Sequence, residues 1–551
     1  MVFEILMNIG RALAALVFGM IVLYHAINLY GLPSRLMSPR IAPWSAAATC
    51  LVLALSVFAL FAPWPQGGDT SWAIWAVGGL ALLLTAPFTF LQKTFGNSDL
   101  ANIISAIQEN KAGDLAEVAA ADLRSDLIEL VVALALAVST LAVLLLSLPG
   151  FGAVLVLLSM AAIVTSRPAA YMFRLLVPDP AAKLVTLDRD FHPPVILARP
   201  AKLPNLVLIY LESLERSYRD HPVTADPFAR MAEFEDHNFS VRRLGQVGGM
   251  HYSAAGLVST QSGIPLFPRG IVDAKVVRKS DGTAGAALSR FLPGVSCLGD
   301  ILAAEGYAGT YLNGSDVEIF SIGDFMRSHG YSKVVGLKPK RDERKVPGQN
   351  SWGVPDATLF AEAKAELARL AASGNPFFLS LLTASTHGPN GYPEPGCSYV
   401  PPVLPAVKHS LLPAAIRCSI DQTLDFVDEI DRLGIADNTV VVITNDHLAM
   451  PNTLWKELRQ VGDRRSGLLV IKGSDAAPAA TICDRPATHL DTFPTILEAM
   501  GYKLRNGRAN LGVSLLSGQP TLAETLGYSL LDRALGSNRD IRAHVWVDST
   551  E

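Results

Sequence analysis

The apolar positions divide this 551-residue chain into two parts. Long, almost uninterrupted apolar runs fill the first third, up to about Phe173, and short apolar runs separated by polar segments make up the rest. A membrane-spanning helix needs about 20 mainly apolar residues. The runs of this kind are Ala12–Leu29, Ala46–Ala62, Ile74–Leu91, Leu127–Leu148 and Phe151–Val164. We therefore expect a transmembrane domain of about five spans at residues 1–175, a linker at 176–202 and a second domain at 203–551.

A weaker apolar pattern lies between the third and fourth runs. Leu100, Ile103 and Ile107 recur at helical spacing, which predicts an amphipathic helix near residues 98–110 on the membrane surface. The first run is followed by more spans and not by a cleavage site, so we interpret it as an anchor. An odd number of spans with the N-terminus inside places the second domain outside, although the Lys and Arg counts of the loops favour the opposite orientation.

Short strands alternate with helices in the second domain. Amphipathic helices are expected at Ala357–Ala371 and Ile420–Leu433. Short apolar runs bounded by turn residues fit strands that are buried on both faces of a parallel sheet. They are Leu206–Tyr210, Phe377–Leu382, Val440–Ile443 and Leu468–Ile471. The alternation predicts an α/β domain with a central, mostly parallel sheet flanked by helices.

Composition and charge narrow the class of protein. Half of the residues are hydrophobic and the formal net charge is −4, so the chain lacks the basic footprint of a nucleic-acid-binding protein. Cys397 and Cys418 flank a proline-rich stretch and could form a disulfide, which would suit an oxidising compartment. The sequence leaves open whether Cys297 and Cys483 meet, and no cysteine spacing suggests structural zinc.

Polar side chains follow three of the predicted strands. Glu212 comes after the first strand, His387 after the second, and Asp446 and His447 after the third. Ligands of open α/β sheets bind outside the carboxyl ends of the strands. We therefore expect these side chains at one edge of the sheet, although each alone has an ordinary structural alternative.

Ser253 adds a hydroxyl to this set. It follows Gly248 and Gly249 and precedes a run of small residues that can start a helix, so it is expected to be the helix N-cap and to lie in a phosphate cradle. A plain helix cap is the alternative. Glu212, Asp446 and His447 could bind one divalent ion with the Ser253 hydroxyl as the fourth ligand, a set that suits Mn²⁺ or Zn²⁺ better than Ca²⁺. Such an ion would lower the pKa of the serine and make it a nucleophile.

These motifs resemble bacterial phosphoglycerol transferase I. That family modifies osmoregulated periplasmic glucans and is grouped with lipoteichoic acid synthase in the alkaline phosphatase/sulfatase superfamily. Asn205–Tyr218 is similar to its first metal motif and Thr444–Met450 to its last. The other matching segments, in order, are Tyr252–Ser253, Ser259–Leu266, Cys297–Leu302, Ser328–Tyr331 and Asn350–Gly353.

The resemblance implies roles for individual residues. Glu212, Asp446 and His447 would be metal ligands, and Ser253 stands where relatives carry a catalytic threonine. His387 would be an acid/base in the lipid-phosphate pocket. The remaining implied site residues are Trp352 and Asp356, which line or brace the substrate site, and His489 and Asp491, which lie behind the metal.

This chain also departs from the family. Ser262 stands where relatives have a cysteine, which leaves Cys297 without its expected partner. The arginine that relatives use on phosphoglycerol is not located, because Asn313–Phe320 offers Asp316 and Glu318 instead. The identity of the acceptor is therefore the weakest implication of the resemblance.

The implied function is transfer of sn-glycerol 1-phosphate from phosphatidylglycerol to a periplasmic glucan, or another glycan, through a covalent Ser253 intermediate. The enzyme would lie in the bacterial inner membrane with its catalytic domain in the periplasm. Mn²⁺ is the expected ion, with Zn²⁺ or Mg²⁺ as alternatives. The rival functions are glycerol phosphate polymerisation of the lipoteichoic acid type, phosphoethanolamine transfer, and a non-catalytic membrane sensor or glucan-binding protein.

Overall fold

The computed structural model describes residues 185–545 apart from several gaps, the longest of which are 267–289, 338–351, 400–409 and 459–464. The expected transmembrane spans and the amphipathic helix near residues 98–110 lie outside the described residues. Among the helices that the structure does describe, none has the length and apolar character needed to cross a membrane.

An eight-stranded sheet forms the centre of the described domain. Five adjacent strands are joined by parallel pairing, as predicted. In spatial order they are β6 (Lys333–Gly336), β5 (Ala308–Asn313), β7 (Phe377–Leu382), β2 (Asn205–Leu211) and β8 (Thr439–Asn445). Beyond β8 come β9 (Leu469–Lys472), β3 (Phe239–Val241) and β10 (Ile482–Cys483). The prediction of a mostly parallel sheet is therefore confirmed.

The central strand β2 shows why this sheet is buried on both faces. All seven of its residues are buried. Val207 and Ile209 belong to one hydrophobic core, whereas Leu206 and Leu208 belong to the other. Because successive side chains of a strand point to opposite faces, one continuous apolar run supplies both cores.

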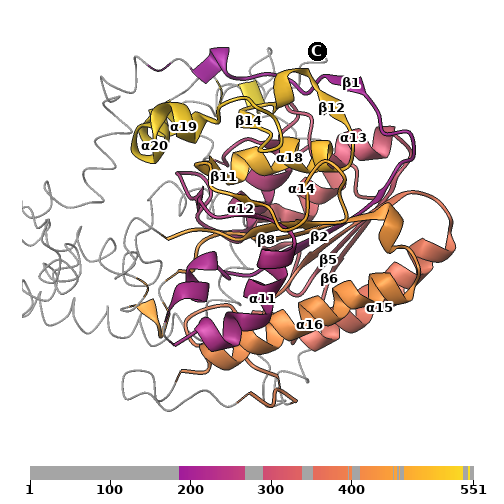
Figure 1. The fold of residues 1–551 in the computed structure, drawn as a ribbon, viewed down its shortest axis with the longest axis vertical. Coiled ribbons are helices and arrows are strands. Elements are labelled where there is room, and N and C mark those ends of the chain that lie inside the picture. The colour runs from indigo at the N-terminus through magenta and orange to yellow at the C-terminus, as the bar shows by residue number, and fades with distance from the viewer. Residues whose placement is uncertain are drawn as a thin grey trace, which may run out of the picture. The chain divides into compact units, whose positions relative to one another are not determined.

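Helices cover both faces of the sheet (Figure 1). One layer consists of α11 (Ala225–His237), α15 (Asp356–Ala372) and α16 (Leu412–Arg432). The opposite layer contains α12 (Ser253–Ser262), α13 (Leu298–Ala304), α14 (Ile322–Ser328) and α18 (Thr492–Ala499). The predicted helix Ala357–Ala371 coincides with α15, and the predicted helix Ile420–Leu433 corresponds to the second half of α16.

The direction of β9 differs from the prediction. The run Leu468–Ile471 was expected in a parallel sheet, but β9 runs antiparallel to both neighbours, β8 and β3. A continuous apolar run indicates that both faces of a strand are buried, but it does not indicate the direction in which the strand runs relative to its neighbours. As a result, the chain leaves β8 at Asn445 and enters β9 at Leu469 from the same edge of the sheet.

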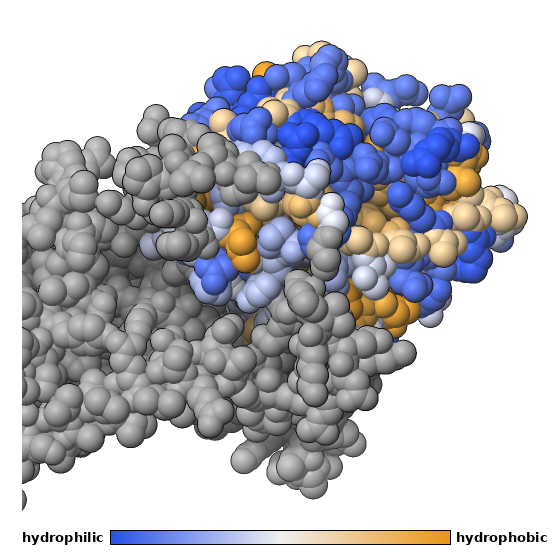
Figure 2. All heavy atoms as spheres, turned by 90° about the horizontal axis from the view of Figure 1, so that it is seen from below, coloured by the Kyte–Doolittle hydropathy of each residue, from blue (hydrophilic) through white to orange (hydrophobic). Residues whose placement is uncertain are grey.

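Smaller elements complete the domain. Within the expected linker, β1 (Ile196–Ala198) pairs with β12 (Lys503–Leu504) in antiparallel fashion. Near the C-terminus, α19 (Leu522–Leu526) and α20 (Tyr528–Ser537) follow each other directly. Figure 2 shows one face of the molecule, on which hydrophilic residues cover much of the described surface and hydrophobic residues form smaller areas between them.

Candidate active site

Parallel pairing of β2 with β8 brings two carboxylates together. Leu211, the last residue of β2, lies opposite Asn445, the last residue of β8. The next residue of each strand is an acid, so Glu212 and Asp446 leave the carboxyl edge of the sheet side by side. His447 follows Asp446, and Ser253 is the first residue of the neighbouring helix α12. The expected convergence at one edge therefore holds for these four residues.

The four side chains are buried and close to one another. The Ser253 hydroxyl donates to Glu212 Oε2 at 3.1 Å. His447 Nε2 lies 3.5 Å from Glu212 Oε1 and 3.4 Å from Asp446 Oδ2. Each of the four residues is at most 4% exposed. One ligand atom from each of Glu212, Asp446 and His447 can be chosen so that all three lie within 4.8 Å of one another.

The charges of this cluster fit a divalent cation. Burial of the Asp446 carboxyl, with the Glu212 carboxylate beside it, raises the pKa of Asp446 to about 7. Asp446 Oδ1 accepts hydrogen bonds from the backbone amides of Ser213 and His447, whereas Oδ2 makes no hydrogen bond within the described part of the chain. Buried carboxylates require a compensating charge. Two carboxylates, one imidazole and one hydroxyl are suitable ligands for Mn²⁺ or Zn²⁺.

The ring of His447 is oriented by its own loop. His447 Nδ1 is 2.9 Å from the carbonyl oxygen of Leu448. A carbonyl can only accept, so Nδ1 carries a proton, and Nε2 is the ring nitrogen that faces the carboxylates. Burial acts to lower the pKa of His447, but the carboxylates of Asp446 and Glu212 raise it above its ordinary value. The ring is therefore oriented as a metal ligand needs, with Nε2 directed at Glu212 and Asp446.

Ser213 links the two carboxylates and was not singled out from the sequence. Its hydroxyl donates to Glu212 Oε1 at 2.8 Å, and its backbone amide donates to Asp446 Oδ1 at 2.9 Å. The residue has a φ of 52°, in the left-handed region that non-glycine residues rarely adopt. Such strain tends to occur where a site over-determines the backbone. A serine directly after a strand-end glutamate gives no distinctive sequence signal.

The start of helix α12 lies one residue earlier than predicted. Tyr252, with extended φ and ψ of −148° and 162°, is the N-cap, and Ser253 is the first helical residue. The Ser253 hydroxyl donates to Glu212 and does not cap a backbone amide of its own helix. Its position at the first turn still places the hydroxyl beside free backbone N–H groups at the positive end of the helix dipole.

His387 packs against Trp352 at the end of β7. Their rings are stacked, with centroids 4.2 Å apart and an interplanar angle of 21°. His387 Nδ1 lies 2.9 Å from the carbonyl oxygen of Gly388, which leaves Nε2 as the other polar atom of the ring. Phe320 contacts both Trp352, at 6.4 Å, and Tyr252, at 5.3 Å between ring centroids. Aromatic rings therefore connect the cap of α12 with His387.

Asp356 lies behind the loop that carries His387. The residue is fully buried, and its Oδ1 accepts from the backbone amides of Ala384 and Ser385 at 2.8 and 3.0 Å. Burial raises the pKa of this carboxyl. These contacts fit the bracing part of the predicted role, because the carboxylate holds the chain that leads from β7 to His387.

The profile of the sulfatase family matches residues 204–502. This chain belongs to the sulfatase family. Phosphoglycerol transferase I of Citrobacter koseri is 32% identical over 338 residues, which are 60% of this chain and 42% of that protein. Phosphoglycerol transferase I of Escherichia fergusonii is 32% identical over 343 residues, or 61% of this chain and 43% of that protein. The matched part of the chain therefore spans less than half the length of these curated relatives.

A solved structure of the lipoteichoic acid synthase LtaP from Listeria monocytogenes is also similar. It is 15% identical with a TM-score of 0.48, and the match covers 66% of this chain and 97% of that one.

Two further predicted residues of this sulfatase-family domain lie in the segment before α18. Asp491 accepts from the backbone amides of Thr488, at 2.8 Å, and Val513, at 2.9 Å, and burial raises its pKa to about 7. His489 is buried near Asp446, and burial lowers its pKa to about 4, which keeps the imidazole neutral. Asp491 therefore organises the local backbone, while His489 lies close to the candidate metal ligands.

The cysteines are arranged partly as expected. Cys397 and Cys418 form a disulfide with their Cα atoms 5.9 Å apart, which ties the loop after His387 to α16. Cys297 and Cys483 are buried free thiols. The Ser262 hydroxyl donates to the carbonyl oxygen of Val258 at 2.7 Å, so at this position a helix-internal hydrogen bond replaces the bridge expected in relatives.

A second cluster of potential ligands does not fit a cation as well. Cys297, Asp300 and His329 also lie within ligand distance of one another. However, Arg290 already pairs with Asp300 Oδ1 at 2.6 Å, and the two ring nitrogens of His329 contact Asp300 Oδ2 and the carbonyl oxygen of Phe291, each at 2.7 Å. The arginine supplies the positive charge, so we assign this cluster a structural role.

Proposed function

We propose that this chain is a membrane-anchored phosphoglycerol transferase. It moves sn-glycerol 1-phosphate from phosphatidylglycerol to a periplasmic glucan through a covalent Ser253 intermediate and releases diacylglycerol. The observation that carries the proposal is the contact of the Ser253 hydroxyl with Glu212 at 3.1 Å, inside a buried group of two carboxylates and one imidazole. The relatives named phosphoglycerol transferase I support the type of group that is transferred.

A divalent cation held by Glu212, Ser253, Asp446 and His447, with Mn²⁺ expected ahead of Zn²⁺ or Mg²⁺, would lower the pKa of the serine hydroxyl and neutralise charge on the phosphoryl oxygens. The chain's own contribution is to fix the positions of these side chains before the substrate arrives. Glu212 accepts the hydrogen bond of Ser253 and so directs the serine oxygen into the cluster. The first-turn amides of α12 add donors for a phosphate oxygen.

The first half-reaction forms the covalent intermediate. Ser253 Oγ releases its proton to water and forms a bond to phosphorus, while the bond from phosphorus to the diacylglycerol oxygen breaks. We assign His387 as the acid that gives a proton to this departing oxygen. Diacylglycerol then remains in the bilayer, and glycerophosphate is esterified to Ser253.

The second half-reaction transfers the group to the acceptor. A glucan hydroxyl gives its proton to His387 and bonds to phosphorus, while the bond from phosphorus to Ser253 Oγ breaks and the serine regains a proton from water. His387 thereby returns to its starting protonation state. Stacking against Trp352 supports this role because it holds the imidazole in one orientation.

The location of the site follows from its donor. A membrane anchor in residues 1–175 would keep the catalytic domain beside the lipid and raise the effective concentration of the donor. The Cys397–Cys418 disulfide supports an oxidising compartment. We therefore assign the catalytic domain to the periplasmic side of the inner membrane.

The test is diacylglycerol release by the full chain in mixed micelles that contain phosphatidylglycerol. Ser253→Ala should lower turnover by about 10³-fold or more, because it removes the nucleophile. Ser259→Ala is the matched control, since Ser259 lies in the same helix and its hydroxyl bonds to the carbonyl oxygen of Ala255. Equal turnover by Ser253→Ala and the wild type would remove Ser253 from the reaction.

A second measurement addresses the acceptor. Mass spectrometry of periplasmic glucans from cells with and without the gene should show loss of phosphoglycerol substituents in the deletion strain. A chain of glycerol phosphate units on a lipid in place of substituted glucans would indicate polymerisation of the lipoteichoic acid type.

A further inference from the structure

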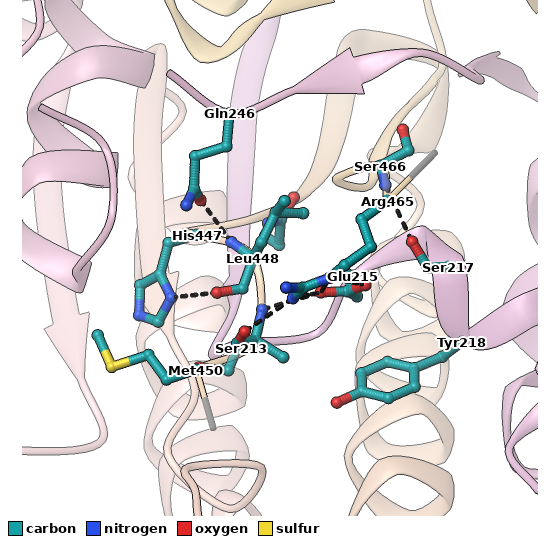
Figure 3. Close-up of polar contacts among 12 residues, drawn as sticks. Ser213, Glu215, Ser217, Tyr218, Gln246, His447, Leu448, Met450, Arg465 and Ser466 are labelled. Atoms are coloured by element: carbon teal, nitrogen blue, oxygen red, sulfur yellow. Dashed lines mark hydrogen bonds and ion pairs between the residues drawn. The ribbon is translucent and has the colours of Figure 1, made fainter. Parts of the chain in front are cut away.

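The loop that follows His447 is held by side chains from distant parts of the chain (Figure 3). The backbone amide of Leu448 donates to Gln246 Oε1 at 2.6 Å. The carbonyl oxygen of the same residue accepts from His447 Nδ1 at 2.9 Å. Gln246 follows β4 (Leu244–Gly245), about two hundred residues earlier in the sequence. Both polar atoms of the Leu448 backbone are therefore occupied.

The next residue is held in the same way. The backbone amide of Ala449 donates to Glu215 Oε2 at 3.0 Å, and its carbonyl oxygen accepts from Arg465 at 2.7 Å. Arg465 Nε contacts Glu215 Oε1 and Oε2 at 2.9 and 3.1 Å. One ion pair thus contacts both polar atoms of Ala449, with its carboxylate on the amide and its guanidinium on the carbonyl.

The carboxylate of this ion pair is buried, the guanidinium is mostly so, and further contacts fix both. The side chains of Glu215 and Arg465 are 0% and 15% exposed. Arg465 also lies over the ring of Trp455, 4.9 Å from its centroid. The next residue, Ser466, donates its amide to the hydroxyl of Ser217, two residues after Glu215. Two contacts, the ion pair and the Ser466–Ser217 hydrogen bond, therefore join the segments around Glu215 and Arg465. Together they hold the guanidinium of Arg465 in one position.

A buried ion pair is a weak source of stability, because desolvation of its charges offsets most of their attraction. Its distinctive property is geometric, since the planar guanidinium donates along fixed directions. Here the guanidinium donates to Glu215 and to the carbonyl oxygen of Ala449, which lies two residues after the candidate metal ligand His447. A hydrophobic pair of equal size would fill the space but would leave the polar atoms of Ala449 without these partners.

We propose that Gln246, Glu215 and Arg465 are positioning residues for His447. They hold the Leu448–Ala449 backbone in the one orientation that lets the Leu448 carbonyl accept from His447 Nδ1, and they thereby direct Nε2 at Glu212 and Asp446. This inference rests on the proposed metal-dependent function and adds residues to it that contact neither metal nor substrate. Groups that orient a metal-ligating histidine in this way commonly change metal affinity by about 10–100-fold.

The experiment is a calorimetric titration of the full chain with Mn²⁺, repeated with Zn²⁺ and with Mg²⁺. Gln246→Leu removes the acceptor for Leu448, and Arg465→Met removes the fork while it keeps an unbranched side chain. Both variants should bind the ion about 10–100-fold more weakly. Gln246→Glu keeps a side-chain oxygen for the Leu448 amide and should bind within about threefold of the wild type.

Arg219→Met is the matched control for a buried pair. Arg219 contacts the fully buried Glu235 of helix α11 at 3.0 Å. Glu235 also pairs with Arg216 at 2.9 Å, so this change removes one arginine from a buried glutamate and leaves the other. It should leave metal affinity unchanged even if it lowers the thermal midpoint. Should Arg465→Met not fold, the two Gln246 variants decide the question.

The outcomes separate the two proposals. Wild-type affinity in both Gln246→Leu and Arg465→Met would overturn the positioning role and leave the proposed function intact. A wild-type chain that bound none of Mn²⁺, Zn²⁺ and Mg²⁺ would overturn the proposed function and this inference with it. Equal losses of affinity in Arg219→Met and Arg465→Met would indicate general destabilisation and would also overturn the positioning role.

Discussion

Gly256 lies directly against the carbonyl oxygen of Asp446. A Cβ atom at Gly256 would come within 1.8 Å of that oxygen. Gly256 is three residues after Ser253, on the first turns of α12, so the absence of a side chain sets how closely the helix approaches the loop of the metal ligands. The contact between Ser253 and Glu212 depends on this approach.

Gly256→Ala should therefore move α12 away from Asp446. We expect a loss of about 1–3 kcal/mol in the free energy of unfolding. We also expect the rate of diacylglycerol release to fall by a larger factor than the affinity of the Glu212, Asp446 and His447 site for the metal. Thermal unfolding and the release assay measure the two effects. Gly518→Ala is the control, because a Cβ at Gly518 would meet nothing within 4 Å among the described residues.

Ser213 provides a separate test of the carboxylate arrangement. Ser213→Gly permits the observed φ of 52° but removes the hydroxyl that donates to Glu212, and Ser213→Ala removes the same hydroxyl. Both variants should weaken Mn²⁺ binding by about tenfold, because Glu212 loses a contact that fixes its orientation. A defect in Ser213→Ala alone would instead assign the effect to the backbone conformation.

Asp491 should make stability depend on pH. Burial raises its pKa to about 7 in the folded chain, whereas an unfolded aspartate titrates near about 4. Between these values the folded state holds the extra proton, so this residue's share of the stability is complete below about pH 4 and is lost as the pH rises through about 7.

The difference in thermal midpoint between the wild type and Asp491→Asn should therefore shrink from pH 5 to pH 8 in the presence of a chelator. The exposed residue Asp475 offers a control, Asp475→Asn, which makes the same substitution at the surface. A gap between the wild type and Asp491→Asn that widens as the pH rises would contradict the burial argument.

The Cys397–Cys418 disulfide should matter more for catalysis than for metal binding. It ties the segment after His387 to α16 across a sequence separation of 21 residues. Replacing both cysteines with serine should cost about 3 kcal/mol of stability and lower turnover, because the His387 loop loses a tether. Metal affinity should remain within about threefold, since none of the four proposed ligands lies on this loop.

The comparison for this prediction is Cys483→Ala, which removes a buried free thiol. Its turnover should match that of the wild type. A parallel loss of metal affinity and turnover in the double-serine chain would show that the disulfide supports the whole site and not the His387 loop alone.

The sequence predicted the parts of this domain that depend on local pattern. The strands were recognisable because each is a short, fully apolar run, as in Phe377–Leu382. The proximity of Glu212 and Asp446 could be predicted because the carboxyl ends of parallel strands lie at a common edge of the sheet. The register of β2 and β8, in which Leu211 pairs with Asn445, places these two acids side by side.

Other features could not be read from the chain. The contact of Gln246 with Leu448 and that of Glu215 with Arg465 join positions more than 200 residues apart. No periodicity encodes such pairs. The left-handed conformation of Ser213 has no compositional signal either, because serine is common in ordinary turns. The direction of β9 was missed for a similar reason, since burial is independent of strand direction.

The reversal of β9 has a consequence for how the domain can diversify. The chain between β8 and β9 departs from and returns to the edge that carries Ser253. Insertions or deletions within it would change the surroundings of Ser253 and the candidate metal ligands while the hydrogen-bonded strands kept their order and spacing. A change in this connection, which begins beside His447 and contains Arg465, would therefore alter the site without altering the sheet.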